Sequence, residues 1–159
     1  MTAAPAGSAG LPAAAVILGY AGLAVFVYGA VIVVSRATAW PTLGLFPPGP
    51  EGGLMILERF GAAVLAFMGG CLWGFASAPG RVPSLERLAA AAVPAVIAFL
   101  AIRPDPALSC LWLAFGFVVL QAIDIRFQRT GIAPAYWLSL RLPLSAGAIT
   151  CLLAGALYG

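Results

Sequence analysis

Few side chains in this sequence are suited to acid–base or metal chemistry. The 159 residues include eight arginines, five acidic residues and no histidine. Histidine is the most frequent general base and metal ligand near neutral pH, so its absence removes the usual centre of such chemistry. A serine or cysteine nucleophile would need a base among Glu58, Glu86 and Asp124, and none of these has an evident hydroxyl partner. We therefore expect no enzymatic activity, no catalytic or metal-binding residue and no cofactor.

The three cysteines, Cys71, Cys110 and Cys151, lie far apart inside apolar stretches and form no CxxC motif. An odd number of cysteines at such spacing is not typical of a zinc site or a disulfide framework. We interpret them as small buried hydrophobic residues.

Asp124 and Arg141 are the charged residues expected at membrane depth on one side of the protein. Asp124 ends the fourth apolar segment, and Arg141 lies in the second turn of the fifth. A charge at the centre of a membrane helix costs about 2.5–3.5 kcal/mol, less near its end, and pairing removes much of that cost. We predict a charge pair between them, with Arg126 or Arg129 compensating Asp124 otherwise. A salt bridge that fixes the packing and a proton or ion relay are both compatible with this pair.

The composition predicts that the chain is a membrane protein. Hydrophobic residues make up 63% of the chain and charged residues 8%, against roughly 25% charged residues in an ordinary soluble domain. The mean hydropathy is +1.06. The net charge of +3 is spread along the chain without a basic cluster, so we expect a lipid bilayer and no nucleic acid as partner.

Five apolar segments predict an all-α fold, a polytopic membrane helical bundle with about five transmembrane helices. At about 1.5 Å per residue, roughly 20 residues cross a hydrocarbon core of ~30 Å. The expected spans are residues 13–34, 54–77, 85–102, 107–123 and 135–158. They form a single transmembrane domain, residues 13–159. It follows a flexible N-terminal tail, residues 1–12, which has too few large apolar side chains to order itself.

Prolines, glycines and charged residues mark the expected connections. Residues 35–53 are dense in proline and glycine, which predicts an irregular loop that its apolar side chains hold on the membrane surface. Ser84 is the expected N-cap of the third helix. Residues 124–133 are expected to form a charged loop, with Pro134 as the first residue of the fifth helix.

The arginines indicate an orientation, because arginine-rich connections stay on the cytoplasmic side of a membrane. Five spans place the two termini on opposite faces. The face shared with the N-terminus carries Arg81, Arg87, Arg126 and Arg129, and the other face carries Arg36, Arg59 and Arg103. We therefore expect a cytoplasmic N-terminus.

Small residues recur along one face of two expected spans. In the second span they are Ala62, Ala66, Gly70 and Gly74, and in the fifth they include Gly147 and Gly155. Such stripes let helix backbones approach closely in lipid, where van der Waals packing drives association. Both stripes are predicted helix-packing interfaces, and each is compatible with packing inside one chain or between chains. The second stripe is a candidate partner for the first.

Three aromatic residues near span ends, Trp73, Tyr136 and Trp137, are predicted interfacial anchors. Their amphipathic rings suit the level of the lipid headgroups. Arg141 follows Trp137 by four residues, so on a helix its guanidinium can stack on the indole ring.

Several of these residues also resemble motifs of a known family. Residues 67–74 (FMGGCLWG) are similar to the FLGGxxWG signature of the DUF3429 family of membrane proteins, and residues 18–23 (LGYAGL) resemble its opening LGxxGL. Asp124, followed by Pro134 and the Leu140-Arg141 pair, resembles its D…P.WY..LR..LT ending. Leu72 stands where a histidine is frequent in the family. The resemblance implies a bacterial inner-membrane or mitochondrial-type helical protein and adds no reaction.

We expect a non-catalytic integral membrane protein that packs against other integral membrane proteins or itself. An accessory or assembly subunit of an energy-transducing complex, respiratory or photosynthetic, fits this expectation. The alternative is a small transporter or channel, in which a proline-broken span and the Asp124–Arg141 pair line a polar path. Against that alternative, the span centres hold few polar groups that could coordinate an ion.

Overall fold

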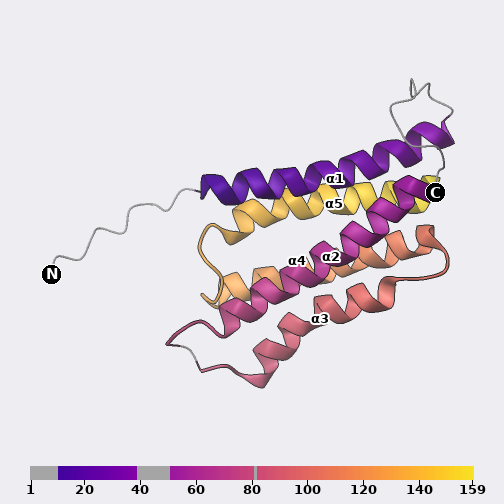
Figure 1. Ribbon diagram of the computed structural model, residues 1–159. Coiled ribbons are helices and arrows are strands. Elements are labelled where there is room, and N and C mark those ends of the chain that lie inside the picture. The colour runs from indigo at the N-terminus through magenta and orange to yellow at the C-terminus, as the bar shows by residue number, and fades with distance from the viewer. Residues whose placement is uncertain (1–10, 39–50, 81) are drawn as a thin grey trace.

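The computed structural model describes residues 11–38, 51–80 and 82–159, with the side chain of Glu51 left out. These residues form five helices and no strand, which confirms the all-helical fold class (Figure 1). The helices are α1 (Ala13–Ala37), α2 (Glu51–Ala76), α3 (Leu85–Ala101), α4 (Pro106–Arg129) and α5 (Trp137–Tyr158). The expected N-terminal tail lies mostly outside the described residues, as does the part of the first loop that spans 39–50.

Four of these helices, α1, α2, α4 and α5, are long and apolar enough to cross a membrane, so the chain is a multi-pass membrane protein. The remaining helix, α3, has 17 residues and a length of about 25 Å, a little less than the thickness of a hydrocarbon core. Helices α2 and α4 run in the same direction, and α3, which connects them, runs antiparallel to both (Figure 1). The start of α1 and the end of α5 lie at opposite ends of the bundle.

Side-chain caps begin the two helices of the α3–α4 hairpin. The Ser84 hydroxyl accepts a hydrogen bond from the Arg87 backbone N–H at 3.4 Å, as the sequence predicts for an N-cap. The Asp105 carboxylate accepts from the Ala107 N–H at 3.0 Å, and Pro106 occupies the first helical turn, where its missing N–H costs nothing.

The connection between α4 and α5 differs from the expectation. Of the expected loop 124–133, only residues 130–133 lie in the connection: α4 continues to Arg129, and α5 begins at Trp137 rather than at Pro134. The charged residues were compatible with a helix that extends past the apolar segment. Gln128, on this extension, donates to the Ala135 carbonyl oxygen at 2.8 Å and accepts from the Leu138 N–H at 2.9 Å, which ties the turn to α4.

A glycine pair brings α1 and α2 into close contact near one end of the bundle. A Cβ added at Gly53 would lie 2.8 Å from the Gly29 carbonyl oxygen, and one at Gly29 would lie 3.0 Å from Leu57. Gly52 and Gly53 are helical rather than part of the expected loop, and the absence of a side chain at Gly53 allows this approach.

A second close approach holds α3 against α2. Gly69 is buried, and a Cβ at this position would lie 2.8 Å from the Ala91 carbonyl oxygen of α3. Its neighbour Gly70 is exposed, and a Cβ there would meet nothing within 4 Å. Adjacent glycines of one motif thus have different surroundings.

We expect Gly69→Ala to lower the free energy of unfolding by about 1–3 kcal/mol, because the opposing atom is backbone and cannot turn aside. Gly70→Ala is the matched control. It should leave stability unchanged or raise it slightly, since alanine is the better helix former. Unfolding of the purified protein in detergent micelles measures both, and equal effects at the two positions would contradict the α2–α3 packing.

Candidate functional site

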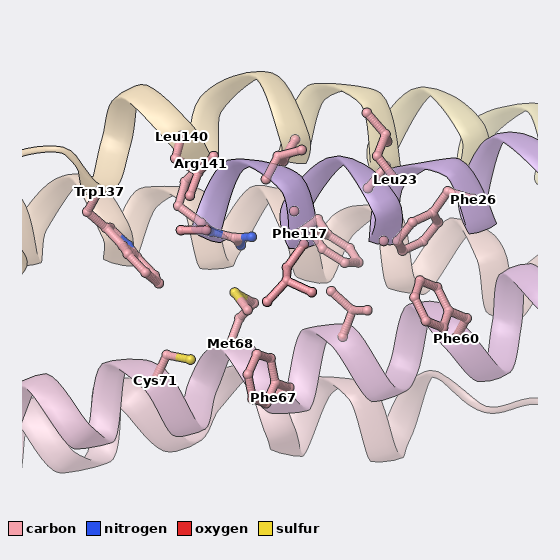
Figure 2. A pocket seen from close by; sticks show the side chains of 17 residues that line it. Leu23, Phe26, Phe60, Phe67, Met68, Cys71, Phe117, Trp137, Leu140 and Arg141 are labelled. Carbon is pink, nitrogen blue, oxygen red and sulfur yellow. The ribbon is translucent and has the colours of Figure 1, made fainter. Parts of the chain in front are cut away.

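An apolar crevice of about 440 Å³ lies between α1, α2 and α5, with Phe117 of α4 at its base (Figure 2). Ligand pockets for small molecules begin at about 300 Å³, so this crevice has room for one. The residues that line it include Gly19, Gly22, Leu23, Phe26, Phe60, Val64, Phe67, Met68, Cys71, Trp137, Leu140, Arg141, Leu144 and Ala148.

The crevice opens on the side of the bundle that α1 and α2 share. Leu18 is 72% exposed and Phe67 is 65% exposed, although both line the crevice. Since both residues lie within helices that cross the membrane, this opening faces the lipid rather than the aqueous phase. At the other end, the Gly29–Gly53 approach and the edge-to-face contact of Phe26 with Phe60, 5.3 Å between ring centroids, bring α1 and α2 together.

Asp124 of α4 lies at the contact between α4 and α5 and is completely buried. Its Oδ1 accepts a hydrogen bond from the Trp137 indole Nε1 at 2.6 Å, and its Oδ2 accepts one from Arg141 Nε at 3.4 Å. Both carboxylate oxygens are therefore occupied, one by a neutral donor and one by a cation. This geometry joins α4 to the first two turns of α5.

Arg141 is 5% exposed and lines the crevice. Its guanidinium carbon lies 5.9 Å from the centroid of the Trp137 ring, which is the stacking suggested by their spacing. Phe75 meets the same indole edge-to-face at 4.8 Å. Within the described residues, Nη2 of Arg141 is buried and has no hydrogen-bond partner. A buried donor without a partner costs free energy, so this nitrogen is available to an acceptor that enters the crevice.

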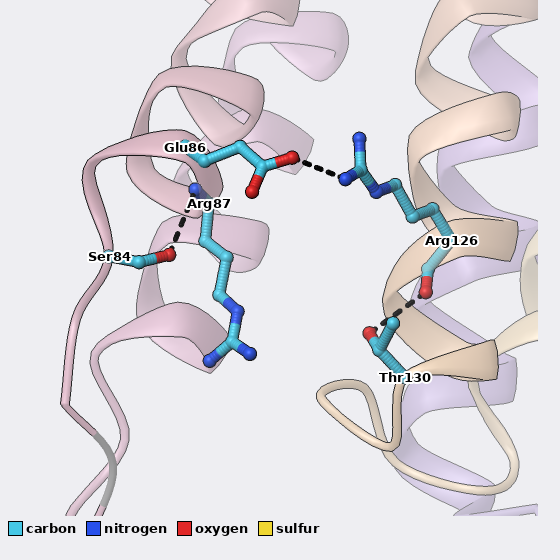
Figure 3. A network of polar contacts seen from close by, with 5 residues as sticks. All are labelled: Ser84, Glu86, Arg87, Arg126 and Thr130. Atoms are coloured by element: carbon cyan, nitrogen blue, oxygen red, sulfur yellow. Dashed lines mark hydrogen bonds and ion pairs between the residues drawn. The ribbon is translucent and has the colours of Figure 1, made fainter.

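A second pair of opposite charge lies near the same end of the bundle but at the surface. Arg126 of α4 donates to Glu86 of α3, and the two side chains are 64% and 71% exposed (Figure 3). Exposed pairs contribute about 0–1 kcal/mol, because water solvates both charges well. Arg126 thus pairs with Glu86, and the partner of Asp124 is Arg141.

The two small-residue stripes occupy different environments. Ala62 and Ala66 are partly buried against the core, but Gly70 and Gly74 are exposed, with nothing within 4 Å of an added Cβ. Gly147 packs against Leu23 of α1, where an added Cβ would meet its side chain at 2.7 Å. Gly155 lies beside Leu57 of α2 and Cys110 of α4, at 2.7 and 3.1 Å. The glycines of the α5 stripe therefore pack inside the chain, and not against Gly70 or Gly74 of α2.

The three expected anchors also differ from one another. Trp73 is 47% exposed and Tyr136 is partly buried. Trp137 is buried, with its indole N–H on Asp124 rather than at a headgroup level. The anchor expectation for Trp137 is corrected in this respect: a nearby buried carboxylate is a stronger partner for an indole N–H than water.

The crevice itself is the feature that sequence reasoning missed. Its walls come from Gly22 and Phe26 on α1, Phe60 and Phe67 on α2, and α5, and no local motif joins them. The available signal was the spacing of Trp137 and Arg141, which places both on one face of α5. Among the described residues, no cluster of three or more cysteine, aspartate or glutamate side chains is placed to hold a metal ion.

Comparison with known proteins identifies the family. The sequence model of DUF3429, described as a protein of unknown function, matches residues 11–157, and the chain therefore belongs to this family. No curated protein and no solved structure matches the chain significantly.

We expect Asp124→Asn to destabilise the protein by about 3–5 kcal/mol, because it leaves the Arg141 guanidinium buried without its anion. Arg141→Gln should cost a similar amount. The double variant should cost clearly less than the sum of the two, since neither charge remains unpaired.

The control is Glu86→Gln, which breaks the exposed pair with Arg126 and should change stability by less than about 1 kcal/mol. Unfolding in detergent micelles measures the four variants. Additive effects of the Asp124 and Arg141 substitutions would contradict a coupled buried pair.

Proposed function

We propose that this protein is a non-catalytic integral membrane protein that packs against another membrane protein through the outer face of α2. The observation that carries this proposal is a pair of exposed glycines on α2. Gly70 and Gly74 are exposed, and the space above both is empty within the described residues. Glycines at this spacing, four residues apart, are suited to the close approach of a second transmembrane helix.

The residues around Gly70 and Gly74 support the same interpretation. Phe67 is 65% exposed and Trp73 is 47% exposed, so large rings flank a flat strip of backbone. A partner helix would fit over the glycines and contact both rings, which restores van der Waals contacts that lipid chains make less well. Glycine in a helix costs about 1 kcal/mol relative to alanine, so a packing role would offset its presence on an outer face.

The short connections between helices support a contact inside the bilayer. The described connections are short: residues 102–105 join α3 to α4, and residues 130–136 join α4 to α5. Helix flanks therefore make up most of the described surface. An accessory or assembly subunit of an energy-transducing complex is the form of this function that we propose, because such complexes offer transmembrane helices as partners.

We further propose that the protein lies in the bacterial inner membrane with a cytoplasmic N-terminus. At the end of the bundle where α1 begins lie Arg87, Arg126 and Arg129, with Arg141 one turn deeper. The opposite end carries Arg36 and Arg103, with Arg59 about two turns inside α2. The margin in arginine favours the α1 start as the cytoplasmic side.

Capture of the protein from native membranes in mild detergent tests the proposed packing. We expect a reproducible stoichiometric membrane partner, and we expect Gly70→Leu with Gly74→Leu to abolish its recovery, because leucine side chains separate the two backbones. Ala24→Leu on the exposed face of α1 is the matched control and should keep the partner.

Three results of this capture would be informative. Recovery of a respiratory or photosynthetic complex would support the accessory-subunit form. Recovery of the protein alone, as a monomer, would overturn the proposal. Equal recovery of the partner with the glycine and control variants would move the contact away from α2.

The orientation has its own measurement. Alkaline phosphatase fused after Tyr158 should be active, and green fluorescent protein fused there should be dark, since the C-terminal end of α5 is expected outside the cytoplasm. The reverse pair of signals would contradict the proposed orientation.

A further inference from the structure

The crevice combines a membrane-facing opening with a single buried donor group. Of the residues that line it, Arg141 alone is charged. The others are apolar apart from the Cys71 thiol, which is a weak donor, and the indole N–H of Trp137, which already donates to Asp124. Arg141 is more than nine-tenths buried, and its Nη2 has no partner within the described residues. Figure 2 shows the guanidinium over the space between α5 and the Met68 side of α2. A ligand that brings an acceptor to this point would satisfy the free N–H.

The charge of the site determines which acceptor fits. Asp124 is completely buried and lies next to Arg141, so the two charges neutralise each other. A carboxylate or phosphate ligand would add an uncompensated negative charge to a buried region, which is costly. An uncharged carbonyl oxygen accepts the same hydrogen bond without that cost.

The walls determine what carries this carbonyl group. From Arg141 the crevice passes Met68 and Phe117 to the aromatic contact of Phe26 with Phe60. These walls are apolar along their length, and the opening at Leu18 and Phe67 faces the hydrocarbon. A molecule already dissolved in the membrane can therefore enter sideways, with its apolar part between α1 and α2.

We propose that the crevice binds an uncharged, lipid-soluble molecule whose carbonyl oxygen accepts a hydrogen bond from Arg141 and whose apolar chain lies between α1 and α2. This chemistry is present in two kinds of membrane component, quinones and acyl esters. The proposal rests on the crevice, and of its residues only Phe67 also belongs to the contact proposed for the outer face of α2.

The probe for this site is a fully substituted benzoquinone, whose ring has no free carbon to which the Cys71 thiol could add, with a decyl tail that carries a diazirine; the unlabelled decyl-benzoquinone has the same ring. The protein is reconstituted in nanodiscs, irradiated with the probe and digested, and mass spectrometry identifies the labelled residues. We expect saturable labelling of crevice residues on α1, α2 and α5. Unlabelled decyl-benzoquinone, methyl laurate and laurate then compete with the probe at a pH at which laurate is ionised.

The competition separates the sources and tests the charge argument. Stronger competition by the quinone supports the proposal with a quinone as ligand, and stronger competition by methyl laurate supports it with an acyl ester. Laurate should compete at least about tenfold more weakly than the better of the two. Laurate competing as well as the carbonyl compounds would overturn the proposal.

Two glycines provide matched variants. Gly22 lines the crevice and Gly70 lies on the outer face of α2, and a Cβ added at either meets nothing within 4 Å, so leucine can be introduced without a clash at Cβ. Gly22→Leu should weaken probe binding by about tenfold or more by filling the crevice. Gly70→Leu should leave it unchanged. Equal binding by the two variants, or labelling spread over all lipid-facing helices, would overturn the proposal.

A variant of the donor tests the head of the ligand. Arg141→Lys keeps a positive charge next to Asp124 but removes the planar guanidinium and its free Nη2, so we expect binding weakened by about tenfold. Circular dichroism and the elution volume report whether the variant is folded. If it does not fold, the Gly22→Leu and Gly70→Leu comparison decides. A folded variant that binds the probe as tightly as the wild type would contradict the role of Arg141.

Discussion

The burial of Asp124 is the constraint on which the rest of this structure depends. A carboxylate that is completely buried in a membrane protein needs donors on both oxygens, and here both come from the first turns of α5. Trp137 and Arg141 must therefore face α4, which fixes how α5 is rotated about its axis. The position of α5 in turn places Leu140, Leu144 and the Arg141 guanidinium along one wall of the crevice.

The crevice exists because close packing is concentrated elsewhere. The Gly29–Gly53 approach brings α1 and α2 together at one end, and Gly147 of α5 receives Leu23 of α1. Between the half of α2 that contains Phe67 and the N-terminal half of α1, no glycine pair closes the gap, and side chains leave about 440 Å³. Close backbone contacts between α1 and α2 at one end, and an ion pair between α4 and α5, thus give a bundle that is packed and still has a crevice open toward lipid.

Much of this architecture was predictable from sequence, and the remainder depended on three-dimensional contacts. Hydropathy gave the membrane bundle, and the Ser84 cap gave the start of α3, because both are local properties. The end of α4 was not predictable from the charged residues, because Arg126 and Arg129 lie within the helix and not in a loop. The turn that follows is held by Gln128. Opposite surroundings for Gly69 and Gly70 arise from where α3 packs, which no local pattern encodes.

The most direct test of the buried Asp124 site is to detect its hydrogen bond from Trp137. Nuclear magnetic resonance of the indole N–H groups in nanodiscs measures this bond. A donor 2.6 Å from a carboxylate oxygen should give a proton resonance shifted downfield and slow exchange with water, whereas Trp73, which is 47% exposed, serves as the internal reference. A Trp137 resonance at the ordinary indole position, exchanging as fast as that of Trp73, would contradict the arrangement of α4 and α5 described above.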